Sequence, residues 1–136
     1  GPMDFNFSEL MEKIAEDIGG QFSEYDKYKS VIIVPLEENR YQAVVGVLKH
    51  SEKLNKTRLE FSSKVCQLSE SVDLKELLME NAKPCYARFV IVDDYVRVEG
   101  STFVESVTES GIKELIDEVA NMADAWELKL TVMDVH

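Results

Sequence analysis

The chain has 136 residues, of which 45% are hydrophobic and 30% are charged, and its net charge is −11. A chain of this size buries enough surface to fold as one domain without a disulfide or a metal. The acidic balance disfavours direct binding to nucleic acid and to anionic membranes, because both carry negative charge.

The net charge has two interpretations. An acidic surface keeps a protein soluble, and it also attracts a basic partner or a basic unfolded segment. Gly1 and Pro2 resemble the remnant of a cleaved tag, so we take residues 3–136 as the single domain. No apolar run resembles a signal peptide or a membrane span. Cys66 and Cys85 are able to pair, but thiols of this kind are typical of a reducing compartment, which predicts a cytoplasmic protein.

The first predicted element is a helix from about Phe7 to Ile18. Asn6, with Glu9 three residues later, matches a capping box, in which a side-chain oxygen accepts an unpaired backbone N–H. Gly19-Gly20 ends the helix, since glycine adopts the left-handed C-terminal cap without steric cost. The apolar residues at helical spacing are Phe7, Leu10, Met11, Ile14 and Ile18.

Three strands are predicted next, at residues 30–34, 41–48 and 57–68. The first is β-branched and stops at Pro35, which cannot donate to a sheet ladder. Gly46 interrupts the second strand and indicates a bulge. The alternation of the third is interrupted by two serines, and its inward face is expected to hold Leu59, Phe61 and Val65.

A second helix begins at Asp73, where Glu76 completes another capping-box pattern. It must end near Lys83, because Pro84 disfavours helical conformation in the residue before it. The buried face of this helix is expected to comprise Leu74, Leu77, Leu78 and Ala82.

A two-strand hairpin follows, with residues 85–92 and 95–99 joined by a turn at Asp93-Asp94. Both aspartates tolerate the positive φ that a tight hairpin needs. The first strand is apolar on both faces, with Phe89 and Ile91 on one side and Val90 and Val92 on the other. A strand of this kind is either central in its sheet or part of an oligomer contact.

The last predicted element is a long helix capped by Ser110. Trp126 is expected in the core, although an exposed tryptophan would instead indicate an interface anchor. The complete order is α-β-β-β-α-β-β-α, an α+β domain with an antiparallel sheet and helices packed on it. The apolar stripe of the last helix comprises Ile112, Leu115, Ile116, Val119, Met122, Ala123, Trp126, Leu130 and Met133.

The sequence contains no recognisable catalytic, metal or cofactor motif. The two histidines, His50 and His136, have no second ligand at zinc-site spacing, and no glycine-rich phosphate loop is present. Asp93-Asp94 is interpreted as a turn rather than a metal or acid–base pair. Arg88 and Arg97 lie on facing strands of the hairpin, where they are able to reach an acidic partner, but they are expected to pair within the protein or with water. We therefore expect no cofactor and no enzymatic activity.

The element order resembles that of class I type III secretion chaperones, including the Tir-chaperone type, and of YbjN-like proteins. The closest local matches are the second helix, Asp73 to Ala82, and the last helix, at 112–119 and at Ala123-Asp124. The second helix resembles the leucine-rich helix of that family, which ends in an asparagine. The element order matches over nearly the whole chain, whereas recognisable residue patterns are confined to residues 73–128.

This resemblance implies a homodimer that receives an extended segment of another protein, through apolar pockets and strand addition to a sheet edge. By analogy, partner-binding pockets would be lined by Leu10, Ile14, Val31, Ile33, Val45 and Val47. The dimer contact would involve Leu74, Leu78, Val96 and Val98. The same residues are also able to fill the core of a monomer.

Three functions are compatible with these observations. The first is a dimeric, non-enzymatic protein-binding module that resembles a secretion chaperone, or a regulatory or scaffolding relative of it. The second is a small acidic inhibitor or immunity-type protein that binds a folded basic partner and loses it at high salt. The third is an enzyme that uses carboxylates, tyrosine and arginine, which would require a deep pocket holding a carboxylate of raised pKa.

Overall fold

The structure is a computed structural model that describes residues 6–134. The sheet is antiparallel, with strand order β1-β2-β3-β4-β6-β5 in the described chain. The predicted α+β class is confirmed, with one strand more than expected between the first two helices. The elements are α1 (Phe7–Asp17), β1 (Gln21–Asp26), β2 (Lys29–Pro35), β3 (Tyr41–Ser51), β4 (Lys56–Gln67), α2 (Leu74–Glu80), β5 (Arg88–Val92), β6 (Tyr95–Phe103) and α3 (Glu109–Asp134), with short 3₁₀ turns at Glu37–Asn39 and Val104–Ser106.

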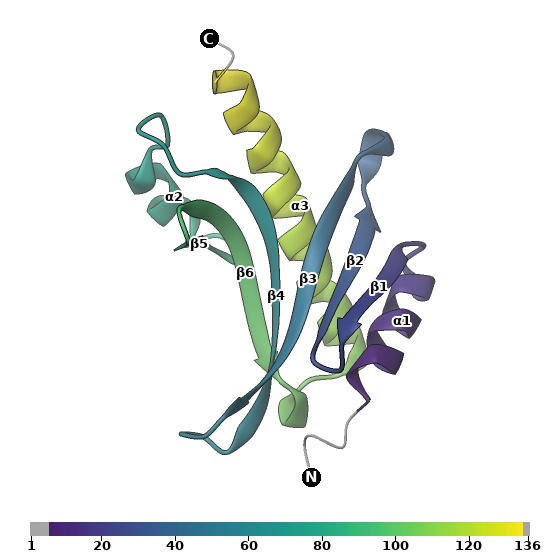
Figure 1. Ribbon diagram of the computed structural model, residues 1–136. Helices are drawn as coiled ribbons and strands as arrows, with labels where there is room; N and C mark the ends of the chain where they lie inside the picture. The colour runs from purple at the N-terminus through teal and green to yellow at the C-terminus, as the bar shows by residue number, and fades with distance from the viewer. Residues whose placement is uncertain (1–5, 135–136) are drawn as a thin grey trace.

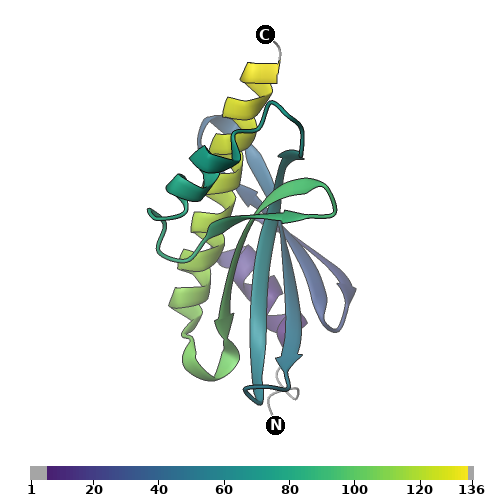
Figure 2. The same ribbon diagram turned by 90° about the vertical axis from the view of Figure 1, so that its left-hand side faces the viewer.

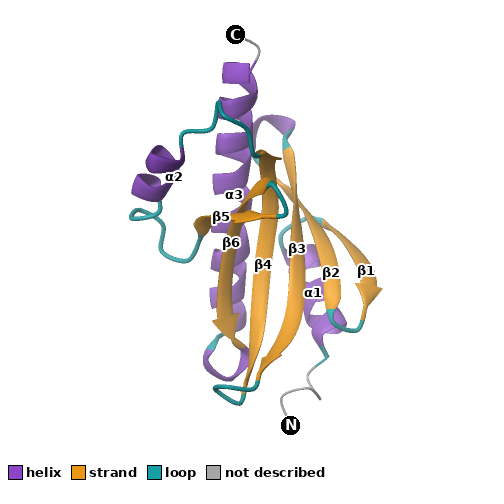
Figure 3. Ribbon diagram, turned by 60° about the vertical axis from the view of Figure 1, so that its left-hand side comes forward, coloured by secondary structure: helices purple, strands orange, loops and turns teal. Residues whose placement is uncertain are grey.

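Helices α1 and α3 cover the same face of the sheet, and the opposite face has no helix on it (Figures 1 and 3). Helix α2 lies at the other end of the sheet from α1, beside α3 (Figure 2). Alternation along each strand sends every second side chain into the layer under the helices. The largest fully buried side chains of this core are Phe7, Met11, Ile14, Ile32, Val44, Leu59, Phe61, Val96, Val98, Leu115, Ile116 and Val119.

Strand β1 was not predicted, because its sequence shows little apolar alternation. Only Phe22 is partly buried against the core, and the other side chains of the strand are exposed. The strand is defined by its pairing with β2 and by a tight turn, in which the Tyr28 N–H donates to Asp26 Oδ1 at 2.7 Å. An edge strand of this kind is specified by backbone pairing rather than by side-chain pattern.

The predicted helix caps and the predicted hairpin turn are confirmed. The Asn6 and Asp73 side chains accept the backbone N–H three residues later, at 3.0 and 3.2 Å. Gly19 has φ +73°, the left-handed conformation expected at the end of α1. Asp93 and Asp94 have φ of 50° and 64°, as a tight hairpin requires.

Two local predictions were wrong. Helix α3 is capped by Thr108 rather than Ser110, since Thr108 Oγ1 accepts the Gly111 N–H at 3.0 Å. Gly46 is in regular register with both neighbouring strands and forms no bulge. A Cβ at this position would lie 2.7 Å from Met11 Cε and 2.9 Å from Phe61 Cε1. Glycine is therefore required there by the close approach of α1.

The inward face predicted for the third strand of the sequence analysis is confirmed in β4. Leu59 and Phe61 are fully buried and Val65 is nearly so. Ser63 continues the same alternation into the core, where its hydroxyl donates to the Ala43 carbonyl at 2.7 Å and accepts from Gln42 Nε2 at 2.9 Å. These hydrogen bonds compensate for the desolvation of a polar group that interrupts an apolar pattern.

Trp126 of α3 is half-buried and packs edge-to-face on Phe89 of β5, with ring centroids 5.2 Å apart. It therefore contributes to the core as expected and ties α3 to the outer strand of the sheet. The remaining stripe residues described, from Ile112 to Leu130, also lie against the core. Met133 and His136 lie outside the described side chains.

The carboxylate of Glu118 on α3 fixes the segment that leads from α2 into β5. It accepts the backbone N–H groups of Cys85, Tyr86 and Ala87 at 3.0, 2.6 and 2.8 Å. Partial burial raises the pKa of Glu118, but the hydrogen bonds from these three amides outweigh it and hold the pKa below its usual value.

We expect Glu118→Gln to destabilise the fold by about 1–2 kcal/mol at pH 7, because a neutral amide is a weaker acceptor for these N–H groups. A carboxyl with a lowered folded-state pKa contributes stability above its unfolded pKa, and the contribution disappears as pH falls through the folded value. The difference between wild type and variant should therefore be complete at pH 7 and should shrink below about pH 4. Urea unfolding at a series of pH values measures the difference in unfolding free energy between wild type and variant.

Asp117→Asn is the matched control, since Asp117 lies one residue away on α3 and accepts from Asn121 instead. Equal losses in the two variants, or a Glu118 effect that does not change with pH, would contradict the role given to this carboxylate.

Candidate functional site

Helix α2 exposes most of its apolar residues instead of burying them. Leu77 is only 4% exposed and points to the core, whereas Leu74, Leu78 and Met79 are 44%, 72% and 65% exposed. The expectation that Leu74, Leu78 and Ala82 are buried was therefore wrong. The helix is short and lies at the margin of the sheet, so only one of its residues reaches the core, and helical spacing alone does not indicate which.

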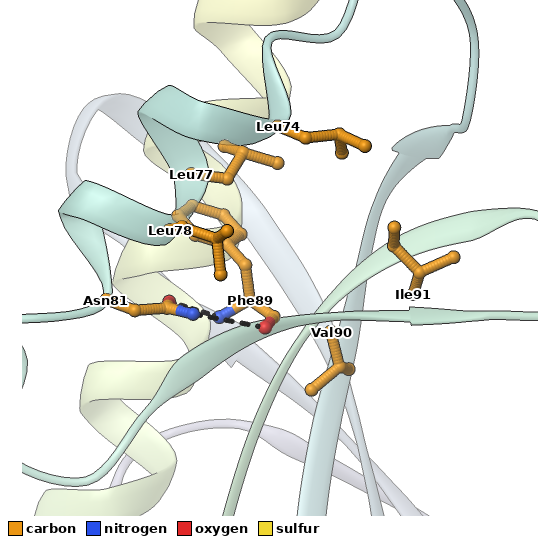
Figure 4. Close-up of a pocket in the computed structure, with 7 residues that line it drawn as sticks. All are labelled: Leu74, Leu77, Leu78, Asn81, Phe89, Val90 and Ile91. Atoms are coloured by element: carbon orange, nitrogen blue, oxygen red, sulfur yellow. Dashed lines mark hydrogen bonds between the residues drawn. The ribbon is translucent and has the colours of Figure 1, made fainter.

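An apolar groove of about 260 Å³ separates α2 from β5 (Figure 4). Leucines of α2 form one wall, and Ile91 of β5, itself 50% exposed, lies on the other side. We call this the α2–β5 groove, and it is lined by Leu74, Leu77, Leu78, Asn81, Phe89, Val90 and Ile91.

Asn81, which directly follows α2, pairs with the backbone of β5 as a neighbouring strand would. Its Oδ1 accepts the Phe89 N–H at 2.6 Å and its Nδ2 donates to the Phe89 carbonyl at 3.3 Å (Figure 4). Antiparallel strands point alternate residues to opposite neighbours. Because the backbone N–H and C=O of Phe89 point away from β6, toward Asn81, the backbone groups of Ile91 point to the same side.

Strand β5 is at the edge of the sheet, because it pairs only with β6. Of the two interpretations of its doubly apolar sequence, the central position is therefore wrong. The contact with another chain stays a prediction. Asn81 protects part of the edge, and such protection limits uncontrolled strand addition.

The six residues predicted for partner binding lie on two faces of the sheet. Val31 pairs across β2 and β3 with Val45, and both are half-buried on the face without helices. Ile33 and Val47 lie on this same face, which we call the open face. Ile14 is fully buried under the sheet and Leu10 is half-buried against the core, because α1 packs on the opposite face.

One pocket lined by all six residues is therefore not formed. The apolar stripe of α1 and the apolar patterns of β2 and β3 were identified correctly. The sequence does not indicate, however, that α1 and the open face lie on opposite sides of the sheet. The four aliphatic residues of β2 and β3 remain available on the surface.

The four residues predicted for the dimer contact are also divided. Leu74 and Leu78 line the α2–β5 groove, whereas Val96 and Val98 of β6 are fully buried under the helices. Strand alternation is the reason, since Arg97 lies between the two valines and points to the open face. The exposed residues that sequence reasoning missed are Met79 of α2 and Ile91 of β5, and the doubly apolar strand was a signal for Ile91 alone.

The described residues contain no group of three or more His, Cys, Asp or Glu side chains able to hold a metal ion. No described helix is long and apolar enough to cross a membrane. Cys66 and Cys85 are not joined in a disulfide, and Cys85 is exposed rather than buried as expected. The expected pairing of both hairpin arginines is confirmed, since Arg88 lies 3.5 Å from Glu99 and Arg97 donates to Ser62 Oγ at 3.1 Å.

Comparison with known proteins gives similarity at the level of structure. No family model matches the chain, and no curated protein matches it. A chain of the HopA1–SchA chaperone–effector complex superposes with a TM-score of 0.62 at 12% identity, over 89% of this chain and 92% of that one. A chain of the heterodimeric ExoU–SpcU complex from the type III secretion system of Pseudomonas aeruginosa has a TM-score of 0.62 at 8% identity, over 89% and 94%. At such identities the likeness concerns architecture, and this chain has the α+β fold of type III secretion chaperones.

Proposed function

We propose that this chain is a non-enzymatic, chaperone-like protein that acts as a homodimer and holds an extended segment of another protein. The α2–β5 groove is the observation that carries the proposal. The exposed Leu74, Leu78 and Ile91 line this groove together beside a sheet edge, and exposed apolar surfaces of this kind mark contacts with other protein chains. The fold shared with chains of chaperone–effector complexes supports the same conclusion.

The occupant proposed for the α2–β5 groove is a second copy of the chain. A two-fold contact would place the exposed Leu78 of each protomer in the groove of its partner, so each apolar contact would occur twice in the interface. Asn81 occupies the backbone N–H and C=O of Phe89, so fewer groups of β5 remain for strand pairing. This favours packing of side chains over continuous strand pairing at this contact.

The partner segment is proposed to bind at the opposite end of the sheet and on the open face. Among residues 6–134, strand β1 pairs with β2 alone, so its outer edge is available for strand addition. The four aliphatic side chains of β2 and β3, Val31, Ile33, Val45 and Val47, supply an apolar surface next to that edge. Whether the partner belongs to a secretion system or to a regulatory pathway, as for YbjN-like proteins, is left to experiment, and the cytoplasm is the expected location.

Leu78→Asp should convert the dimer to a monomer. Each copy of the leucine contributes about 1.5–3 kcal/mol when buried, and a two-fold contact contains it twice, so the loss is about 3–6 kcal/mol. Light scattering over a concentration series measures the mass, and the circular dichroism spectrum should stay that of the wild type because Leu78 is 72% exposed in the protomer.

Leu54→Asp is the control, because Leu54 is 54% exposed in the β3–β4 turn, remote from α2 (Figure 1). A wild-type protein that stays monomeric at every concentration would overturn the homodimer.

Wild-type protein used as bait in source-cell lysate should capture a specific partner through an extended segment. In that complex, hydrogen exchange of the β1 amides should slow by at least about tenfold, since added strand pairing protects them. Val45→Asp should lose the partner while keeping the dimer. A one-to-one complex with a folded basic protein that dissociates at high salt would instead support an acidic inhibitor.

A further inference from the structure

The open face of the sheet differs in charge from the rest of the molecule. Strand register places basic side chains there, alternating with the residues buried under the helices. The acidic strand residues on this face are Asp26, Glu60 and Glu99, although the net charge of the chain is −11. The basic residues are Lys29, Lys49, Lys56, Arg58, Lys64, Arg88 and Arg97.

Two of the three carboxylates of the open face, Glu60 and Glu99, are already paired with cations, and the third, Asp26, accepts the Tyr28 N–H at 2.7 Å. Glu60 accepts from Arg58 and, at 3.3 Å, from Lys49. Burial raises the pKa of Glu60, but the hydrogen bonds from these two cations outweigh it and hold the pKa below its usual value, so the carboxylate is ionised and satisfied. Glu99 lies 3.5 Å from Arg88. Neither is therefore free for the other cations.

Lys29, Lys64 and Arg97 have no carboxylate at ion-pair distance among the described residues. Lys29 lies over the ring of Tyr25 and Lys64 over the ring of Tyr95, at 5.1 and 4.2 Å from the centroids. Contacts of this kind position a cation without neutralising its charge.

Lys64 and Arg97 are also directly opposite each other on β4 and β6. Like charges at opposed positions on neighbouring strands are destabilising. A bound carboxylate would remove this repulsion, so the pair is better suited to a liganded state than to the isolated chain.

The three cations line a shallow hollow of about 460 Å³ on the open face, with Val45 and Val47 contributing apolar surface. Glu60 and Glu99 also line it, but both are paired with cations outside the hollow. Asp93 of the hairpin turn lines it as well and makes no ion pair with the three cations. The hollow therefore combines unneutralised positive charge with aliphatic side chains. This combination complements a peptide that presents carboxylates next to aliphatic residues, whereas a nucleic acid would leave the valines without a counterpart.

We propose that the open face binds an acidic segment of the partner protein, in which carboxylates alternate with aliphatic side chains. Lys29, Lys64 and Arg97 neutralise the carboxylates, and the valines of β3 contact the aliphatic residues. The inference rests on the proposed function and specifies its partner. It also reverses the expectation that a net acidic chain selects a basic segment, because the sign of charge that matters is that of the binding face.

The test uses a fluorescent peptide of alternating glutamate and valine as the probe, and a peptide of alternating lysine and valine as its counterpart. Fluorescence anisotropy with the wild-type protein at low salt should show the acidic peptide binding at least about tenfold more tightly, and the preference should fall as salt rises. Arg97→Glu and Lys64→Glu should each weaken acidic-peptide binding about tenfold or more. Each variant replaces a like-charge pair with an opposite-charge pair, so the melting temperature should be kept or raised.

Lys53→Glu is the matched control, since it makes the same change of net charge at an exposed position in the β3–β4 turn. Equal affinity for both peptides, or unchanged binding in Arg97→Glu and Lys64→Glu, would overturn the inference. Complete displacement of the acidic peptide by a single-stranded oligonucleotide would overturn a peptide as the occupant. If the native partner is still captured with protection of β1 in any of these cases, the proposed function stands and only the acidic segment fails.

Discussion

Helices α1 and α3 pack on the same face of the antiparallel sheet, and the rest of the molecule follows from this arrangement. Every second residue of each strand is buried beneath them, as the fully buried Val96 and Val98 illustrate. The alternate residues have no second helical layer to cover them. The open face, the β1 edge and the α2–β5 groove are therefore the surfaces that we propose for contacts with other proteins.

The two edges of the sheet differ in whether a side chain covers their backbone groups. At β5, the Asn81 side chain pairs with the Phe89 backbone, and Glu118 holds the segment just before the strand. Both interactions fix α2 beside the outer strand and leave an apolar groove between them. At β1 no comparable side chain covers the edge in the described structure. This asymmetry favours a packed contact at one end and strand addition at the other.

The candidate site shows where sequence reasoning fails. Leu74, Leu77 and Leu78 are equally apolar and share helical spacing, yet only Leu77 is buried. The difference depends on where α2 sits relative to α3 and β5, which are distant in sequence. In the same way, the net charge of −11 averages over all faces and does not indicate where basic side chains gather. The cations of the open face become a group only when β2, β4 and β6 are aligned in register.

Local chemistry in the sequence was sufficient to predict the helix caps at Asn6 and Asp73, the hairpin turn at Asp93-Asp94 and the α+β class, because each depends on neighbours within a few residues. Strand β1 was missed since an exposed edge strand carries no apolar alternation. Periodicity also predicted the buried faces of β4 and α3, but the tertiary structure alone decided which residues of α2 are buried and which face of the sheet the helices cover. These outcomes depend on contacts between segments far apart in the chain, and no periodicity within one segment records them.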